Sequence, residues 1–324
     1  MEPILKVQNL HTEIKMDYGT FEAVNGVDFE LQKGETLGLV GESGCGKSLT
    51  SLSLTGLLGP KVRVSQGQAI FEGRDILHLP EAEKRALRGG KISMIFQEPM
   101  TALNPLFTIG NQMVEMMLPH MKISRKEALA RAVKLLTDMG IERPERIVKS
   151  YPFQLSGGML QRVMIAMSLS CNPRILIADE PTTALDVTIQ AQILKLMNEL
   201  KEKYDTSIIL ITHNLGVVAQ ICDRVAVMYF GQIVETAPVK ELFENPRHFY
   251  TKGLLGCIPK LDEDEELLNT IPGMVPAVTE KIEGCSFAPR CSKCMEKCRH
   301  SMPQLEPVSE GHSCRCWYVL EGGK

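Results

Sequence analysis

The run GESGCGKS at residues 41 to 48 constrains this chain more than any other stretch of its sequence. Its glycines and lysine fit the pattern G-x-x-x-x-G-K-[ST], in which a backbone turn directs N–H groups at phosphate oxygens. The apolar run ETLGLV precedes it, and the segment SLTSLSLTGLLG, which is compatible with a helix, follows it. A helix N-terminus behind such a loop favours bound anions. The order strand, loop and helix therefore predicts a phosphate-binding site in an α/β fold.

The residues of this loop have separate expected roles. Lys47 should reach the β- and γ-phosphates of a nucleotide, and Ser48 should ligate Mg²⁺. Cys45 lies in the same loop, and we expect it to be an ordinary small packing residue, although its place in the loop also allows modification by thiol reagents. The residues expected to bind nucleotide here are Gly41, Gly44, Gly46, Lys47, Ser48 and Leu49.

The run ILIADE at residues 175 to 180 supplies a partner for the loop. Its four apolar residues predict a buried strand that ends at Asp179, where a second Mg²⁺ contact belongs. Glu180 comes next, and a carboxylate at that place can polarise an attacking water. We therefore expect Asp179 to bind the metal and Glu180 to act as general base.

A second anion site is predicted at LSGGMLQRV, residues 155 to 163, because Ser156 and two glycines open a helix with free N–H groups. This run resembles the signature motif of ABC-transporter ATPases. Gln97 after ISMIF, TALD at residues 183 to 186, and His213 after SIILIT complete the same set. Alone, His213 could be a core histidine and Gln97 a strand-end amide. In order and spacing, residues 4 to about 240 resemble this family.

The resemblance implies a head-to-tail dimer of ATPase domains that encloses two nucleotides. In such a dimer Ser156, Gly157 and Gly158 face the γ-phosphate bound by the other subunit. An aromatic side chain near the first strands usually stacks on adenine. Tyr18 and Phe21 are both candidates for that role, and their spacing alone does not decide between them.

The resemblance also implies a role for each remaining motif residue. Glu180 is the general base, and His213 contacts the γ-phosphate and orients water. Gln97 ligates Mg²⁺ or water and senses the membrane partner. Asp186 couples the two nucleotide sites. Only the complete set of motifs, and none of these residues alone, points to ATP hydrolysis in this way.

The length of 324 residues and the 44% hydrophobic content predict one large domain with an extension. We expect a P-loop NTPase core with an antiparallel β subdomain and an inserted helical subdomain at about 100–172. This nucleotide-binding domain covers residues 1–245, and a C-terminal extension covers 246–324.

Local patterns give finer expectations. Strands within residues 4 to 40 should be separated at Asp17–Gly19, Asn25–Gly26 and Lys33–Gly34. The segment FEGRD should be the turn of a hairpin between residues 67 and 79. In the helical part, the pattern of KEALARAVKLLTDMG places one apolar face at Leu129, Val133, Leu136 and Met139.

The net charge of −3 argues against a nucleic-acid partner. The longest stretch without Asp, Glu, Lys or Arg, residues 206 to 222, is too short and too polar to span a bilayer. The chain does not open on a basic and then apolar signal sequence. We therefore expect a soluble protein, peripheral on the cytoplasmic face of the cell membrane.

Six of the ten cysteines lie between Cys285 and Cys316. In a cytoplasmic chain such a cluster indicates a metal more often than disulfides. The spacings of Cys291, Cys294, Cys298 and either Cys314 or Cys316 are compatible with zinc.

A narrower resemblance gives a different assignment. VNGVDF, VGESGCGKS, QEPMTALNP, LSGGMLQRVMIA and GCSFAPRC are similar to the ATPase subunits of dipeptide, oligopeptide and nickel ABC importers. In that family the tail resembles an iron–sulfur site, which would place a [4Fe–4S] cluster on Cys285, Cys291, Cys298 and Cys316. Four thiolates suit such a cluster. Zinc stays the alternative, because Cys294 and Cys314 are extra to the pattern.

The family also implies the partners. They are a second ATPase subunit (a paralogue or the same chain), two transmembrane permease subunits and an extracytoplasmic substrate-binding protein. We expect ATP hydrolysis that powers uptake of dipeptides or oligopeptides. One alternative keeps this role for nickel or another solute. Another is a non-transport ABC ATPase, but only 107 residues separate Ser48 from Ser156, which leaves no room for the long coiled coil of repair types.

Overall fold

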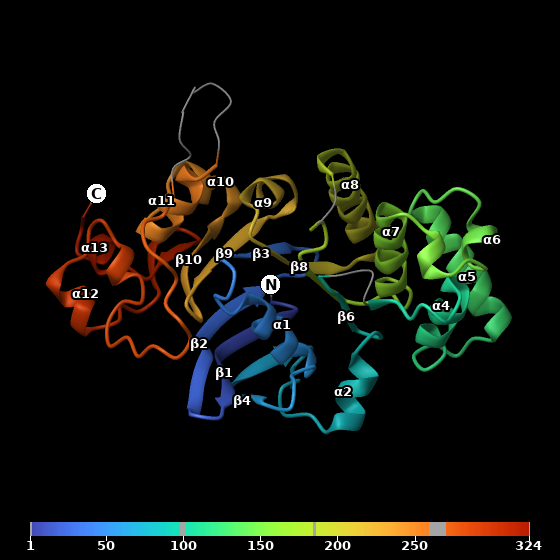
Figure 1. The fold of residues 1–324 in the computed structure, drawn as a ribbon, viewed down its shortest axis with the longest axis horizontal. Helices are drawn as coiled ribbons and strands as arrows, with labels where there is room; N and C mark the ends of the chain where they lie inside the picture. The colour runs from blue at the N-terminus through green and yellow to red at the C-terminus, as the bar shows by residue number, and fades with distance from the viewer. Residues whose placement is uncertain (1, 98–101, 184–185, 259–269, 324) are drawn as a thin grey trace. The chain divides into compact units, whose positions relative to one another are not determined.

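The computed structural model describes residues 2–97, 102–183, 186–258 and 270–323. The chain divides into two compact units, and Figure 1 shows its elements. The first unit comprises Met1–Leu31, Glu35–His78 and Ile211–Lys324, and the second comprises Gln32–Gly34 and Leu79–Leu210. The C-terminal region therefore belongs to the same compact unit as the phosphate loop.

An antiparallel sheet opens the first unit, with the strand order β2-β1-β4-β5. Its strands are β1 (Leu5–Met16), β2 (Gly19–Leu31), β4 (Val62–Phe71) and β5 (Arg74–Asp75). The turn between β4 and β5 is the predicted hairpin turn. The predicted break at Asn25–Gly26 is wrong, because β2 runs through it. Gly26 has φ 65°, and the pairing of β1 with β2 shifts register nearby, so a bulge absorbs the irregularity.

Five strands of a second sheet follow in the same unit, in the order β11-β12-β10-β9-β3. They are β3 (Thr36–Val40), β9 (Arg224–Tyr229), β10 (Gln232–Pro238), β11 (Glu306–Ser309) and β12 (His312–Cys314). Strands β3 and β9 are parallel, whereas β10 pairs antiparallel with both β9 and β12. The C-terminal region thus adds strands to the sheet that carries the phosphate loop.

Strands β6 (Ile92–Ile95), β7 (Ile175–Asp179) and β8 (Ser207–Thr212) lie in the order β8-β7-β6. All residues of β7 and β8 are buried. Continuous apolar runs of this kind are typical of parallel strands covered on both faces. The pairing of β6 with β7 is indeed parallel.

Helices gather in the second unit, where α4 to α7 lie together in Figure 1. The helices are α2 (Glu81–Leu87), α4 (Ile109–Met117), α5 (Arg125–Asp138), α6 (Pro144–Ile147), α7 (Gly157–Ser168) and α8 (Val187–Tyr204), with the 3₁₀ turn η1 (Pro152–Gln154). The predicted apolar face of α5 is confirmed at Leu136 and Met139, which are buried, and Val133 is half-buried. The prediction is wrong at Leu129, which is 42% exposed, whereas Ala128, Ala132 and Leu135 are buried.

The first unit carries the helices α1 (Lys47–Thr55), α9 (Leu215–Ile221), α10 (Val239–Glu244), α11 (Phe249–Gly256), α12 (Glu296–His300) and α13 (Trp317–Leu320), with the 3₁₀ turn η2 (Ala288–Arg290). Tyr229, Tyr250 and Phe287 form an aromatic core between the sheet and the C-terminal region, with ring centroids 4.6 to 5.5 Å apart. This core joins β9, α11 and the segment that precedes η2.

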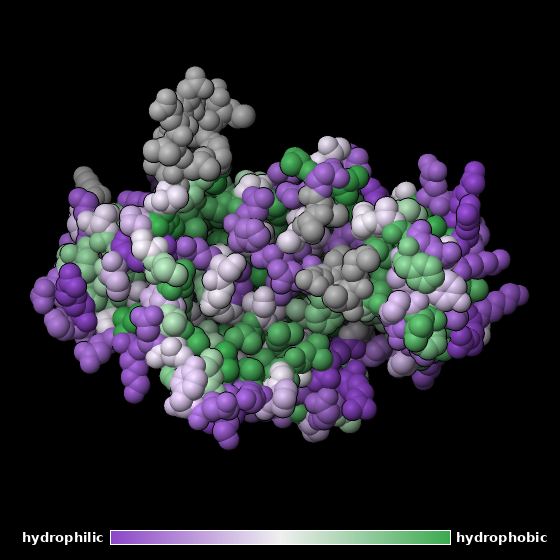
Figure 2. All heavy atoms as spheres, viewed as in Figure 1, coloured by the Kyte–Doolittle hydropathy of each residue, from purple (hydrophilic) through white to green (hydrophobic). Residues whose placement is uncertain are grey.

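Hydrophobic residues are concentrated on one part of the surface. Figure 2 shows them gathered over α1 and the neighbouring strands β1 and β2 on the face in view. Among the described residues, none of the helices has both the length and the hydropathy that a bilayer crossing requires.

Candidate nucleotide site and signature turn

The phosphate loop is built tightly into the first unit. It follows the fully buried strand β3 and ends where α1 begins at Lys47. A Cβ on Gly41 would overlap the carbonyl oxygen of Met228, and one on Gly46 would lie 2.6 Å from the carbonyl oxygen of Ala23. Gly46 also has φ 105°, which side chains rarely allow. The fold of this chain therefore demands glycine at both positions.

Lys47 is buried and folds back over the loop. Its Nζ donates to the carbonyl oxygens of Gly41 at 2.8 Å and Glu42 at 2.9 Å. An ammonium that is taken out of water needs such partners. The lysine is thus fixed at the mouth of the loop, where it can exchange these partners for phosphate oxygens.

Cys45 is buried, as expected of a small packing residue, and its burial limits access to thiol reagents. Its side chain is 1% exposed, and its Sγ lies 3.6 Å from the Nζ of Lys47. Burial raises the pKa of the Cys45 thiol above its ordinary value of 9.0, although Lys47 opposes the shift. The residue packs beneath the loop, since a Cβ on Gly41 would lie 2.8 Å from its sulfur.

The carboxylates after β7 lie where the sequence predicts them. Asp179 is the last residue of the strand and is 5% exposed. The Oε2 of Glu180 accepts a hydrogen bond from the Nε2 of Gln97 at 3.2 Å and one from the Oγ1 of Thr183 at 2.8 Å. The structure therefore brings Gln97 and Glu180 together, across 83 residues of sequence. Thr183, two residues after Pro181, was not predicted as a contact of Glu180.

The signature turn begins helix α7 in the second unit. Ser156 is the N-cap, and its side chain accepts a hydrogen bond from the N–H of Met159 at 3.4 Å. Ser156 and Gly157 are exposed. A Cβ on Gly157 would meet no atom of the described chain within 4 Å, and one on Gly158 would lie 3.3 Å from the side chain of Ile189. Packing within the described chain therefore does not explain Gly157.

Other predicted residues lie at element ends. Asp186 is the N-cap of α8 and accepts a hydrogen bond from the N–H of Ile189 at 2.9 Å. Val187, which follows it, is 83% exposed. His213 is exposed and comes directly after β8, ahead of the α9 cap Asn214. Ala184 and Leu185, between Thr183 and Asp186, lie outside the described residues.

The two candidate adenine-stacking rings lie side by side at the turn between β1 and β2. The ring centroids of Tyr18 and Phe21 are 5.7 Å apart. Tyr18 is 74% exposed, whereas Phe21 is half-buried. Strand β2 continues from Phe21 to Ala23, whose carbonyl oxygen approaches Gly46. The β1–β2 hairpin is therefore packed against the phosphate loop through Ala23.

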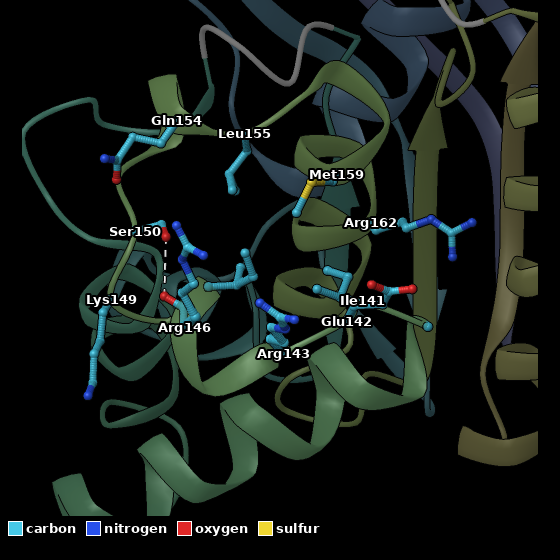
Figure 3. A pocket seen from close by; sticks show the side chains of 12 residues that line it. Ile141, Glu142, Arg143, Arg146, Lys149, Ser150, Gln154, Leu155, Met159 and Arg162 are labelled. Atoms are coloured by element: carbon cyan, nitrogen blue, oxygen red, sulfur yellow. Dashed lines mark hydrogen bonds between the residues drawn. The ribbon is translucent and has the colours of Figure 1, made fainter.

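A hollow of about 740 Å³ lies beside the signature turn. Figure 3 shows the side chains of Arg143 and Arg146 on one side of it and those of Leu155 and Met159 on the other. Lys149 also lines it, and Glu142 is the one acid among its lining residues. The hollow is therefore basic on one wall and apolar on the other.

The C-terminal cysteines lie close enough to affect one another. Burial raises the pKa of Cys285 to about 12, and Cys298, Cys316 and Cys291 add to the rise. Burial likewise raises the pKa of Cys291 to about 11, with further contributions from Cys316, Cys294 and Cys298. Within the described parts of the chain, no group of three or more His, Cys, Asp or Glu side chains is arranged to hold a single metal ion.

Comparison with known sequences decides the family. Residues 24–183 match the family described as ABC transporter, and residues 234–298 match the oligopeptide/dipeptide transporter C-terminal region. The oligopeptide transport ATP-binding protein AppD of Bacillus subtilis is 52% identical over 100% of this chain and 99% of its own. The chain belongs to the ATP-binding proteins of the peptide ABC transporters.

Other relatives agree with this ABC ATPase assignment. The oligopeptide transport ATP-binding protein OppD of Haemophilus influenzae is 48% identical, with 99% of each chain covered. Among solved structures, the post-hydrolysis dimer of the ATP-binding cassette MJ0796 with ADP and Pi has a TM-score of 0.65 at 27% identity, over 72% of this chain and 98% of that one. The structure of cbiO1 from Clostridium perfringens, part of the ABC transporter complex cbiONQ, has a TM-score of 0.64 at 29% identity, over 76% of this chain and 92% of that one. The fold is that of an ABC ATPase cassette.

Some contacts of this ABC ATPase had no signal in the sequence. Glu42 of the phosphate loop bonds to Arg290 and to Tyr250, which lie 248 and 208 residues away. Neither partner belongs to a nucleotide-binding motif. Arg290 lies in the run GCSFAPRC, which predicted a metal ligand at Cys291 and no contact with the phosphate loop.

Proposed function

We propose that this chain hydrolyses ATP to power the uptake of dipeptides or oligopeptides through an ABC importer. The observation that carries the chemistry is the Glu180 carboxylate, placed directly after buried Asp179 and oriented by Gln97 and Thr183. A positioned carboxylate can take a proton from an attacking water. The peptide cargo comes from the names of the relatives, since the cargo does not contact an ATP site.

Different residues bind the phosphates, the Mg²⁺ and the attacking water in this proposal. Lys47 and the N–H groups of the loop bind the β- and γ-phosphates. The hydroxyl of Ser48, the carboxylate of Asp179 and the amide oxygen of Gln97 are the oxygen donors that Mg²⁺ prefers. When bound, Mg²⁺ would neutralise charge on the phosphate oxygens. His213 contacts the γ-phosphate and orients the attacking water.

Adenine stacks on Tyr18 in this proposal. Its 74% exposure leaves a ring face open, and the half-buried Phe21 supports it from 5.7 Å. Stacking on an exposed aromatic ring needs little rearrangement of the hairpin. Tyr18→Ala should weaken ATP binding more than Phe21→Leu, and the reverse order would assign the role to Phe21.

Two ATPase subunits close head to tail on two nucleotides. The support is Gly157, which is exposed and which packing in the described chain does not require. A glycine that packing in its own chain does not require leaves room for a contact from another subunit, which a Cβ would obstruct. Asp186 and the exposed Val187 extend the same kind of surface. The second subunit is either a copy of this chain or a paralogue.

The permease subunits contact an apolar and basic surface of the second unit. Leu106 is 79% exposed and Phe153 is 68% exposed. Their segments run side by side, since the N–H of Ile109 donates to the carbonyl oxygen of Ser150. Exposed apolar patches of this kind mark interaction sites. The same proposal places the chain at the cytoplasmic face of the cell membrane, linked through the permease subunits to an extracytoplasmic peptide-binding protein on the other side.

This surface can be tested by charge reversal in the neighbouring hollow. Arg143→Glu with Arg146→Glu should reduce co-purification with the permease subunits while the isolated chain still binds ATP. Arg125→Glu, on the exposed start of α5, is the matched control. Unchanged co-purification of the double variant would move the permease contact elsewhere.

The C-terminal thiols bind a [4Fe–4S] cluster through Cys285, Cys291, Cys298 and Cys316. Burial and neighbouring thiols of this set raise the pKa of Cys285 and Cys291, which supports a shared site, and such clusters take four thiolates. Zinc would need its sulfurs about 2.3 Å from one point, a tighter arrangement. Anaerobically purified protein should contain iron and sulfide at about four each per chain. Stoichiometric zinc without iron would reverse the choice.

The central test is Glu180→Gln. The amide keeps the size of the side chain but removes the base, so kcat should fall about 10²-fold or more. ATP binding should persist, and a stable ATP-bound dimer should accumulate in size-exclusion chromatography. Hydrolysis at the unmodified rate would remove Glu180 as the base.

A further inference from the structure

The phosphate loop is tied to the C-terminal region by a buried ion pair. Arg290, the last residue of η2, donates from Nη1 to the Oε2 of Glu42 at 2.8 Å and from Nη2 to its Oε1 at 3.1 Å. The Arg290 side chain is 4% exposed, and that of Glu42 is 29% exposed. Two parallel bonds between a guanidinium and a carboxylate fix orientation as well as distance.

The guanidinium is itself fixed from several sides. Its Nε donates to the carbonyl oxygen of Pro272 at 2.9 Å, and Nη2 lies 3.4 Å from that of Ile271. The group lies over the rings of Tyr229 and Phe287, 5.8 and 6.0 Å from their centroids. A guanidinium stays charged in proteins, so Glu42 is bonded to a cation. Arg290 is therefore a rigid part of the C-terminal region.

Glu42 passes this constraint to the nucleotide site. It is the second residue of the phosphate loop. Its N–H donates to the hydroxyl of Tyr250 at 2.8 Å, and its carbonyl oxygen accepts from the Nζ of Lys47 at 2.9 Å. The side chain, amide and carbonyl of one loop residue thus all have fixed partners. Two of those partners, Arg290 and Tyr250, come from the C-terminal region.

We infer that Arg290 is a positioning residue for ATP binding, through which the C-terminal region sets the shape of the phosphate loop. Arg290 touches Glu42 and not the nucleotide. Its effect passes through the carbonyl that bonds Lys47, whose ammonium must meet the phosphates. The inference rests on the proposed binding of ATP at this loop, but it adds a dependence that the motifs do not contain.

A double-mutant cycle on the full chain tests the inference. Glu42→Gln and Arg290→Gln should each weaken binding of MgATP about tenfold, which corresponds to about 1.4 kcal/mol. The double variant should bind no more weakly than either single variant, because both remove the same contact. Arg299→Gln, an exposed arginine of the same region, is the matched control and should bind as the unmodified chain does.

Two further measurements separate positioning from loss of fold. Steady-state ATPase assays should show KM raised about tenfold with kcat within twofold, since the catalytic carboxylate is untouched. Arg290→Lys keeps the charge but not the two-pronged geometry, and it should recover only part of the affinity. If thermal melting shows that Arg290→Gln unfolds, the cycle is replaced by Glu42→Gln, on the less buried partner, and Arg290→Lys, which should each still weaken MgATP binding.

The outcomes are distinct. If the unmodified chain does not bind MgATP, the proposed function fails. If it binds and both single variants bind equally well, Arg290 does not position the loop. If the two losses multiply to about a hundredfold in the double variant, the residues act independently and the inference is overturned.

Discussion

The phosphate loop and the signature turn are both glycine-rich runs ahead of a helix, yet they relate differently to the rest of the chain. In the loop, Gly41 and Gly46 lie against backbone atoms of Met228 and Ala23. In the turn, a Cβ on Gly157 would meet no described atom within 4 Å. The first motif is shaped by its own fold, whereas the second offers a surface for something that comes from outside.

The same contrast extends to the polar side chains. Lys47 is buried and bonded to two loop carbonyls, whereas Ser156 is exposed and caps its own helix. Glycine in a motif can thus reflect intramolecular packing or intermolecular contact. Substitution experiments can tell these two causes apart, because only the first cause affects the stability of the isolated chain.

The largest effect should come from Gly46→Ala. Its φ of 105° and the 2.6 Å approach to the Ala23 oxygen should lower the free energy of unfolding by about 3 kcal/mol. Gly157→Ala should change it by less than about 0.5 kcal/mol, because the site is open. Chemical denaturation measures both. ATPase activity should be lost in both variants, and equal destabilisation would break the comparison.

A smaller effect on stability is expected at Ser156. Ser156→Ala removes the N-cap of α7 and should cost about 1 kcal/mol in unfolding free energy. Ser156→Asp keeps a cap of similar quality, so its stability should match that of the unmodified chain. Its charge should nevertheless repel a γ-phosphate and abolish formation of the ATP-bound dimer. A dimer that formed normally with Ser156→Asp would show that the turn is not at the phosphate.

The last comparison is of thiol labelling rates, which report access to a side chain and not the free energy of unfolding. Only the thiolate reacts, and burial raises the pKa of Cys45 above 9.0. Its labelling at pH 8 should therefore be slow and should rise with pH beyond pH 9. An exposed thiol introduced by Ser156→Cys should react far faster. Peptide mass spectrometry gives both labelling rates in one sample. Comparable rates would contradict the burial of Cys45.

The sequence predicted the motif-bearing elements well because local signals define them. The apolar runs of β3 and β7 are such signals. The turn expected at Asn25–Gly26 was wrong because a strand can absorb a glycine as a bulge. The apolar face of α5 was wrong at Leu129, because the helix buries the side that carries Ala128 and Ala132 instead.

Long-range contacts could not be predicted in this way. Nothing near Glu42 in the sequence indicates Arg290, and the burial of Cys45 depends on how the loop folds over it. The contact of Gln97 with Glu180 was not predicted, since the family resemblance gave each residue a role but no bond between them. Motif spacing predicts which residues matter, whereas the packed chain determines what supports them.

Strand β11 has a consequence for the behaviour of the protein in a crowded cell. It is the terminal strand in the order of its sheet, and its Glu306 and Pro307 are both exposed. Proline has no N–H to donate to a neighbouring strand, and the charge of Glu306 beside it disfavours pairing with a strand of another molecule. The C-terminal residues therefore end this side of the sheet with a strand that disfavours edge-to-edge aggregation.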